Sequence, residues 1–154
     1  MTAYLIDTNV IVRWVLPHDP LSPPARTAVK RLVQQGDAIY VGTQNLMEFW
    51  SVATRPHAAN GLGMRPAQAA AEVDRIEALF PILDDIPAIY RHWRHLVETC
   101  GILGRQVFDA RLVALMAAHR VTHILTFNTE DFRRYPDIVV VSPHDIVRSA
   151  PVEP

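Results

Sequence analysis

The chain opens with Ala3-Tyr4-Leu5-Ile6-Asp7-Thr8-Asn9, an apolar run that ends in one acid and two small polar residues. Residues 4–7 predict a short buried strand, and apolar residues at helical spacing from Asn9 to Leu16 predict a helix directly after it. In an open sheet of parallel strands, ligands bind just beyond the carboxyl ends of the strands. Asp7 therefore lies where a functional side chain is expected.

The alternation of strands and helices continues along the chain. Strands are predicted at residues 38–41, 81–83, 123–126 and 138–141. Helices are predicted from an N-cap at Ser22 to Gly36, from an N-cap at Thr43 to Ala53, and at residues 66–79, 88–100 and 109–119. Strands separated by helices predict an α/β fold, with a mostly parallel five-stranded sheet that is covered by helices on both faces.

Length and composition restrict the class of protein. A chain of 154 residues predicts one domain, placed here at residues 1–148, with a tail at residues 149–154. Cys100 is the only cysteine, which excludes an internal disulfide and a cysteine-rich zinc site and favours a cytoplasmic location. No apolar run approaches the roughly 18 residues of a membrane helix, so no membrane association is expected. The net charge of −1 gives no overall basic field for nucleic acid.

Further polar residues follow the other predicted strands. Glu48 lies in the first turns of the helix after the second strand, and Asp109 is predicted to open a later helix. Thr126, Asn128 and Asp131 follow the fourth strand. Because the strand-to-helix junctions of a parallel sheet share one edge, we expect these side chains to converge with Asp7.

Such convergence has an electrostatic consequence. Two carboxylates 4 Å apart repel by roughly 4 kcal/mol at an effective dielectric constant of about 20. Either some of them take up protons, or a divalent cation neutralises them. Oxygen ligands without paired His or Cys favour Mg²⁺ or Mn²⁺ over Zn²⁺, and such an ion can activate water against a phosphodiester.

Each acid also has an ordinary structural interpretation. Asp109 could cap its helix, and Glu48 could belong to a solvated helix face. Asp7 could organise the turn that follows it, and Asp131 could be a surface acid or the cap of a short final turn. The expectation that all four share one edge favours a functional interpretation.

Four segments resemble the PIN-domain ribonucleases, and in particular the VapC-type toxins of bacterial toxin–antitoxin pairs. They are Leu5-Ile6-Asp7-Thr8-Asn9, Thr43 with Glu48, Gly104-Arg105-Gln106-Val107-Phe108-Asp109-Ala110, and Leu125-Thr126-Phe127-Asn128-Thr129-Glu130-Asp131-Phe132. The resemblance implies a five-stranded parallel sheet, RNA cleavage dependent on Mg²⁺ or Mn²⁺ that leaves 5′-phosphate and 3′-hydroxyl ends, a cognate antitoxin and a homodimer.

Position by position, the resemblance implies that Asp7, Glu48 and Asp109 bind the metal, with Thr8, Asn9 and Thr126 as small polar residues around them. Asn128 stands where many members have a fourth acid, so a second metal would be held less well, and Asp131 is the candidate to supply the missing charge. Phe108 stands where the family often has His, and we interpret it as a packing residue.

RNA requires basic contacts beside an acidic pocket. The candidates are Arg13, Arg91, Arg94, Arg105 and Arg111, of which Arg105 is favoured because it lies in a glycine-flanked loop four residues before Asp109. Arg91 and Arg94 share a helix face that could equally be solvated. The tryptophans Trp14, Trp50 and Trp93 are interpreted as core residues rather than base-stacking ones.

Two other functional classes are alternatives to a ribonuclease. A module that binds RNA or an antitoxin with little turnover is the main alternative, and the Asn128 departure motivates it. A phosphotransfer receiver or phosphatase is disfavoured, because Lys30 is the only lysine and Asp7-Thr8-Asn9 lacks a second acid. Residues 10–32 combine apolar helices with a proline-rich loop and could form a groove for an amphipathic partner.

Overall fold

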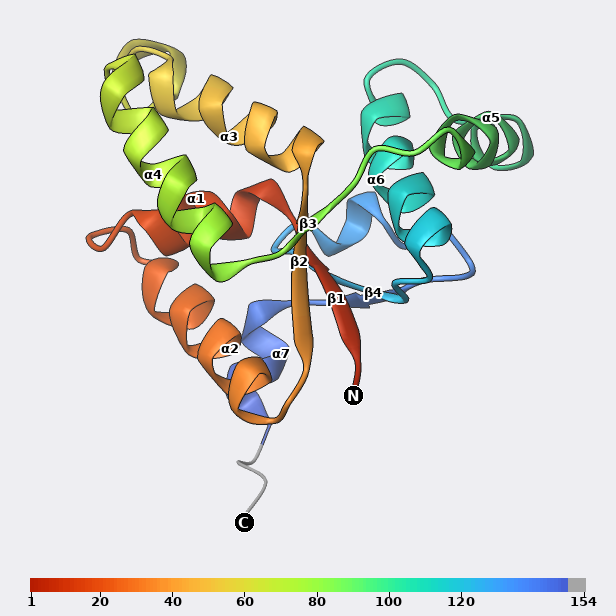
Figure 1. Cartoon of the computed structure of the whole chain (residues 1–154), viewed down its shortest axis with the longest axis horizontal. Coiled ribbons are helices and arrows are strands. Elements are labelled where there is room, and N and C mark those ends of the chain that lie inside the picture. Colours follow the sequence, from red (N-terminus) through yellow and green to blue (C-terminus); the bar gives the residue numbers. More distant parts are fainter. Residues whose placement is uncertain (150–154) are drawn as a thin grey trace.

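A computed structural model describes residues 1–149 as a parallel sheet between two groups of helices (Figure 1). The strands are β1 (Ala3–Ile6), β2 (Ala38–Gly42), β3 (Ile82–Leu83), β4 (His123–Leu125) and β5 (Val139–Val141). The helices are α1 (Thr8–Val15), α2 (Ser22–Gln34), α3 (Thr43–Thr54), α4 (Pro66–Leu79), α5 (Ala88–Thr99), α6 (Gln106–His119) and α7 (Pro143–Arg148), with short 3-10 turns η1 (His57–Ala59) and η2 (Thr129–Asp131).

The sheet has the order β3-β2-β1-β4-β5, and all its neighbouring strands are parallel. The predicted α/β class and the five-stranded parallel sheet are confirmed. The opening strand β1 is central, since Tyr4 pairs with Ile39 of β2 on one side and with His123 of β4 on the other. A central parallel strand is covered on both faces, which explains its uninterrupted apolar sequence.

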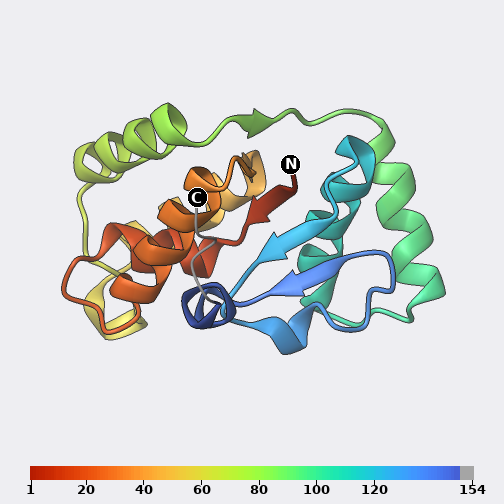
Figure 2. The same cartoon turned by 90° about the horizontal axis from the view of Figure 1, so that it is seen from below.

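The two faces of the sheet have separate hydrophobic cores. Ile6 packs on the side of α1, α2, α3 and α4, whereas its neighbour Leu5 packs on the side of α5 and α6. Figures 1 and 2 show these two helical groups on either side of the strands. Both Leu5 and Ile6 are fully buried, so β1 anchors the two layers to each other.

Several predicted boundaries differ from the structure by a few residues. Ser22 is already helical, and its Oγ accepts from Arg26 Nε over 3.1 Å instead of capping α2. Gly42, not Thr43, is the N-cap of α3, because Thr43 is already helical, and Asn45 Oδ1 accepts from Gly42 N over 3.0 Å. The helix α6 begins at Gln106, so Asp109 lies in its first turn rather than at its start.

Two of the strands end one residue earlier than predicted. β1 ends at Ile6 and β4 at Leu125, which places Asp7 and Thr126 just past the ends of two adjacent strands. Of the predicted tail, Ser149 is described, and residues 150–154 lie outside the described residues. No helix within residues 1–149 combines the length and the apolar character needed to cross a bilayer.

Candidate active site

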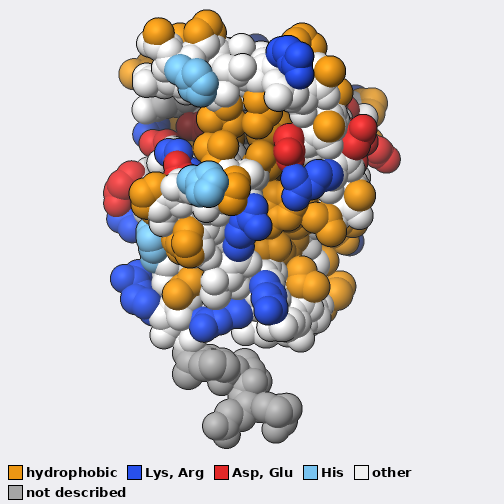
Figure 3. Space-filling view, turned by 90° about the vertical axis from the view of Figure 1, so that its left-hand side faces the viewer, with side chains coloured by type: hydrophobic (Ala, Val, Ile, Leu, Met, Phe, Trp, Pro, Cys, Tyr) orange, Lys and Arg blue, Asp and Glu red, His pale blue; other side chains and the backbone are white. Residues whose placement is uncertain are grey.

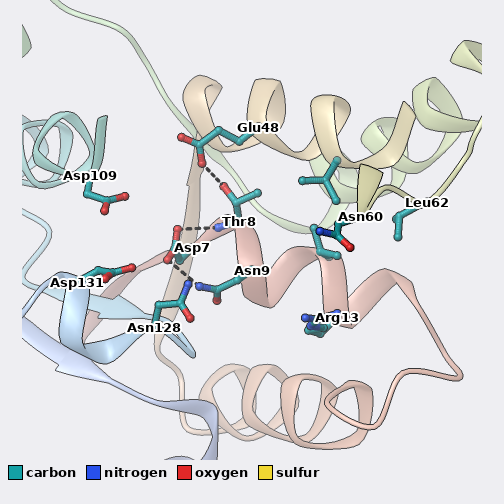
Figure 4. A pocket seen from close by; sticks show the side chains of 12 residues that line it. Asp7, Thr8, Asn9, Arg13, Glu48, Asn60, Leu62, Asp109, Asn128 and Asp131 are labelled. Carbon is teal, nitrogen blue, oxygen red and sulfur yellow. Dashed lines mark hydrogen bonds between the residues drawn. The ribbon is translucent and has the colours of Figure 1, made fainter. Parts of the chain in front are cut away.

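The structure brings most of the predicted polar residues to one cavity of about 350 Å³ at the carboxyl edge of the sheet (Figure 4). Its lining includes the predicted residues Asp7, Thr8, Asn9, Arg13, Glu48, Asp109, Asn128 and Asp131. Figure 4 shows the acids grouped around one end of the cavity, with Arg13 and Asn60 toward the other. The separate segments therefore meet at a single edge, as the strand order requires.

Asp7 is the most enclosed of these acids, at 7% exposure. Its Oδ1 accepts from Thr8 N over 2.8 Å, and its Oδ2 accepts from Thr126 Oγ1 over 2.8 Å and from Asn9 Nδ2 over 3.1 Å. Burial is the main cause that raises the pKa of Asp7 to about 7; these hydrogen bonds lower it, and the negative charges of Glu48 and Asp109 contribute to the rise. Asp7 is thus a carboxylate that lacks a cationic partner among the described residues.

Glu48 is oriented by two neighbouring side chains. The Thr8 hydroxyl donates to Glu48 Oε2 over 2.7 Å, and Gln44 Nε2 donates to Glu48 Oε1 over 2.9 Å. Asn45 Nδ2 donates to the Thr8 hydroxyl over 3.3 Å, which holds that hydroxyl in place. Glu48 is therefore part of a hydrogen-bonded network between α1 and α3 rather than a freely solvated residue.

Asp109 faces the same cavity from α6 and is half-buried. Burial raises the pKa of Asp109 to about 6, with further contributions from the charges of Asp131 and Glu48, while Arg134 opposes the shift. No hydrogen-bond donor among residues 1–149 reaches the Asp109 carboxylate, so its position in the first turn of α6 does not serve to cap that helix. Its oxygens are free to bind a ligand.

Thr126 lies beneath the cavity and is fully buried. Its hydroxyl donates to Asp7 Oδ2 and accepts from Asn9 Nδ2 over 3.1 Å and from Asn128 N over 3.0 Å. Asn9 Oδ1 in turn accepts from Phe127 N over 3.0 Å. Thr126 and Asn9 therefore tie the turn after β4 to the turn after β1 and position Asp7.

The side chains that line the cavity include possible ligands for a cation. No three Asp, Glu, His or Cys side chains in the described part of the chain lie close enough together to hold one ion among them. Mg²⁺ commonly takes only one or two carboxylates directly and keeps several waters, so it does not require such a cluster. The lining offers carboxylate and amide oxygens and no His or Cys, which fits hydrated Mg²⁺ or Mn²⁺.

The predicted basic residues are distributed differently from the expectation. Arg13 lines the cavity and pairs with Asp19 over 2.8 Å. Arg105, the favoured candidate, does not line it, and neither do Arg91 and Arg94. Arg94 pairs with Glu98 on its own helix over 2.6 Å, as in a solvated helix face. Arg105 is the N-cap of α6, and its side chain does not reach the cavity.

Gln44 is a site residue that the sequence did not reveal. Its Nε2 donates to Glu48 Oε1 and, over 2.8 Å, to the Phe108 carbonyl, while its Oε1 accepts from Arg111 Nη1 over 3.2 Å. Gln44 thus connects the helix that carries Glu48 with the residue before Asp109. Its spacing of four residues from Glu48 was the only available signal, and such pairs are common on helices.

Two aromatic residues lie at the surface, contrary to prediction. Phe108 is 59% exposed, and Trp50 is 38% exposed, so neither is a core residue. Trp14 and Trp93 are partly buried and pack against the cores. Helical spacing indicates which residues share a face but not whether another element covers that face, which is why the prediction for Trp50 was wrong. Phe108 was interpreted as a packing residue only because it replaces a His of the family pattern, and that substitution does not indicate burial.

Comparison with known proteins assigns the fold. The PIN domain family model matches residues 4–138. VapBC2 from Rickettsia felis, solved with a DNA fragment from its promoter, has a TM-score of 0.70 at 17% identity, covering 92% of this chain and 98% of the other. VapBC-1 from nontypeable Haemophilus influenzae has a TM-score of 0.67 at 15% identity, with 93% and 99% covered.

A third similar structure is VapC20 from Mycobacterium tuberculosis, described as a toxin that cleaves the sarcin-ricin loop. Its TM-score is 0.59 at 17% identity, with 83% of this chain and 92% of the other covered. No curated protein matches the sequence. At these low identities the structural similarity establishes the fold, and the family model independently covers most of the chain.

Proposed function

The chain belongs to the PIN domain family, and from that membership we propose that it is an endoribonuclease that hydrolyses RNA phosphodiester bonds with Mg²⁺ or Mn²⁺. The observation that carries the proposal is the single cavity lined by Asp7, Glu48 and Asp109, which come from three different elements. Three acids around one cavity, without a cationic partner for Asp7, suit a site that gains its positive charge from a bound ion.

The residues of the chain would act through position and charge. Asp7, Glu48 and Asp109 would hold a hydrated cation, one or two of them directly and the rest through its waters. Thr8, Asn9 and Thr126 would fix Asp7 and Glu48 through the hydrogen bonds described above. When bound, the ion supplies electrostatic stabilisation of the phosphate and a more acidic water. Asp7, with a pKa of about 7, would release its remaining proton as the ion binds.

Asn128 and Asp131 bear on the number of ions. Both line the cavity, and the charge of Asp131 contributes to the raised pKa of Asp109. We assign to Asp131 the fourth carboxylate that Asn128 does not provide. This arrangement supports turnover, and it weakens the case for a module that only binds RNA.

The direct test is cleavage of an end-labelled RNA by the purified protein. Cleavage is expected with millimolar Mg²⁺ or Mn²⁺, and it should be abolished by EDTA and by Asp7→Asn or Asp109→Asn. Asp137→Asn is a matched control, because Asp137 is exposed and does not line the cavity. RNA cleavage that persists in EDTA, or that both cavity variants retain, would contradict the proposed mechanism.

We further propose that the protein is the toxin of a toxin–antitoxin pair. Several structures with this fold are toxin–antitoxin complexes, among them one from Klebsiella pneumoniae. The surface formed by α1, α2 and α4 supports a partner: Figure 3 shows a band of hydrophobic side chains on this face with Lys and Arg beside it. Trp14 lies there between Arg26 and Arg75, at 5.9 Å and 5.8 Å from their guanidinium carbons.

An antitoxin segment with apolar and acidic residues would complement this face. The test is co-purification with a small DNA-binding protein encoded next to this chain. A stable complex that inhibits RNA cleavage is expected, and Arg26→Glu combined with Arg75→Glu should weaken it. A neighbouring protein that neither binds nor inhibits would contradict the toxin role without affecting the nuclease chemistry.

A further inference from the structure

A second cavity of about 480 Å³ adjoins the acidic one. We call it the Phe108 pocket, and its lining includes Thr43, Met47, Glu48, Asp85, Phe108 and Arg111. Glu48 also lines the acidic cavity, so the two cavities share a wall. A ligand in this pocket would therefore contact Glu48, one of the candidate catalytic acids.

The apolar side chains of the pocket are available to a ligand. Phe108 is 59% exposed and Met47 is 68% exposed, on α6 and α3 respectively. Large apolar side chains beside a polar cavity would gain free energy if a flat apolar group covered them. No described residue of the chain covers them in this way.

The polar side chains of the pocket are joined by hydrogen bonds. Arg111 Nη2 donates to Asp85 Oδ1 over 3.1 Å, and Thr43 Oγ1 donates to Asp85 Oδ2 over 2.5 Å. Gln44 accepts from Arg111 and holds the Phe108 carbonyl, so it fixes both sides of the pocket. The charge of Asp85 is balanced by Arg111, and the pocket therefore presents no unpaired acid of its own besides the shared Glu48.

We propose that the Phe108 pocket binds the base of an RNA nucleotide next to the scissile phosphate, with the Phe108 ring as its stacking platform. The inference rests on the proposed ribonuclease function. The apolar walls fit the face of a base better than a phosphate, and every base offers such a face. The shared Glu48 places this base adjacent to the acids, where single-stranded RNA would continue from the cavity.

A binding experiment tests the pocket independently of cleavage. Fluorescence anisotropy of a short labelled single-stranded RNA is measured with Mg²⁺ in an Asp109→Asn background, combined with Phe108→Ala, Phe108→Leu or Phe108→Tyr. Stacking predicts that Ala and Leu each weaken RNA binding about tenfold, whereas Tyr preserves it. Leu79→Ala is the control, because Leu79 is equally exposed at 59% but lies outside the pocket.

The alternative occupant is another protein, including a second copy of this chain, and the same variants identify it. If the pocket were a protein interface, Phe108→Leu should behave nearly like the wild-type protein. In that case Phe108→Ala should lower the molar mass measured by light scattering. Either result, or unchanged RNA affinity in Phe108→Ala, would overturn the proposal. Failure of the wild-type protein to cleave RNA would refute the ribonuclease instead, while aromatic-dependent RNA binding would still support the pocket.

Discussion

The Thr8 hydroxyl donates to Glu48 Oε2 over 2.7 Å, while the Thr8 backbone N–H donates to Asp7 Oδ1 over 2.8 Å. One residue at the start of α1 thus orients two acids that are far apart in the sequence. Thr8→Val should keep the shape of the side chain but remove the hydroxyl, and we expect kcat for RNA cleavage to fall roughly 10- to 100-fold. Thr8→Ser should retain most of the activity, and equal losses in the two variants would contradict this role.

Asp7 makes the stability of the metal-free protein depend on pH. Its folded-state pKa of about 7 exceeds the ordinary value of 3.8, so the folded state binds more protons than the unfolded state between these values. The free energy of unfolding in EDTA should therefore decrease as the pH rises from about 4 to about 7. Asp109, with a pKa of about 6, contributes in the same direction.

Urea unfolding at several pH values measures this effect. Asp7→Asn should flatten the pH dependence, and added Mg²⁺ should stabilise the wild-type protein more at pH 8 than at pH 5, because the ion binds the ionised acids. Parallel pH profiles for wild type and Asp7→Asn would show that Asp7 is not the group responsible.

Gln44 should control the spacing between Glu48 and Asp109. Gln44→Ala removes the donor to Glu48 and to the Phe108 carbonyl, so we expect a loss of about 1–3 kcal/mol in the free energy of unfolding. The Mg²⁺ concentration for half-maximal activity should rise as well, because Glu48 loses its orientation. Gln35→Ala, at an exposed position, is the matched control. A stability loss with unchanged Mg²⁺ dependence would make Gln44 a purely structural residue.

Arg13 and Arg94 should differ in their effect on RNA. Arg13 lines the acidic cavity, whereas Arg94 pairs with Glu98 on the surface of α5. Arg13→Ala should weaken RNA binding and lower the slope of log affinity against log salt by about 0.7, as for one lost phosphate contact on a single strand. Arg94→Ala should change neither quantity, and a similar effect of both variants would place the RNA elsewhere.

The sequence predicted the architecture because its signals are periodic and local. The apolar run before Asp7 and the turns around Gly36 and Gly101 locate strands and helix ends, and even the two-residue strand β3 was recognised. The convergence of the acids followed from one topological rule: the carboxyl ends of parallel strands lie at the same edge of the sheet.

What the sequence did not predict depends on contacts between distant segments. The hydrogen bond from Gln44 to the Phe108 carbonyl joins residues that are 64 positions apart, and no local sequence pattern indicates it. The exposure of Phe108 depends on how α3 and α6 are separated, and the direction of Arg105 depends on where α6 begins. The cap of α3 differs for a similar reason, since the Thr43 hydroxyl donates to the distant Asp85 carboxylate instead of accepting from the backbone of its own helix.

The central position of β1 has a consequence for biosynthesis. β4 pairs with β1, which lies far before it in the sequence, and the Thr126 hydroxyl reaches Asp7 across 119 positions of the chain. The candidate site is therefore incomplete on a growing polypeptide until most of it has left the ribosome.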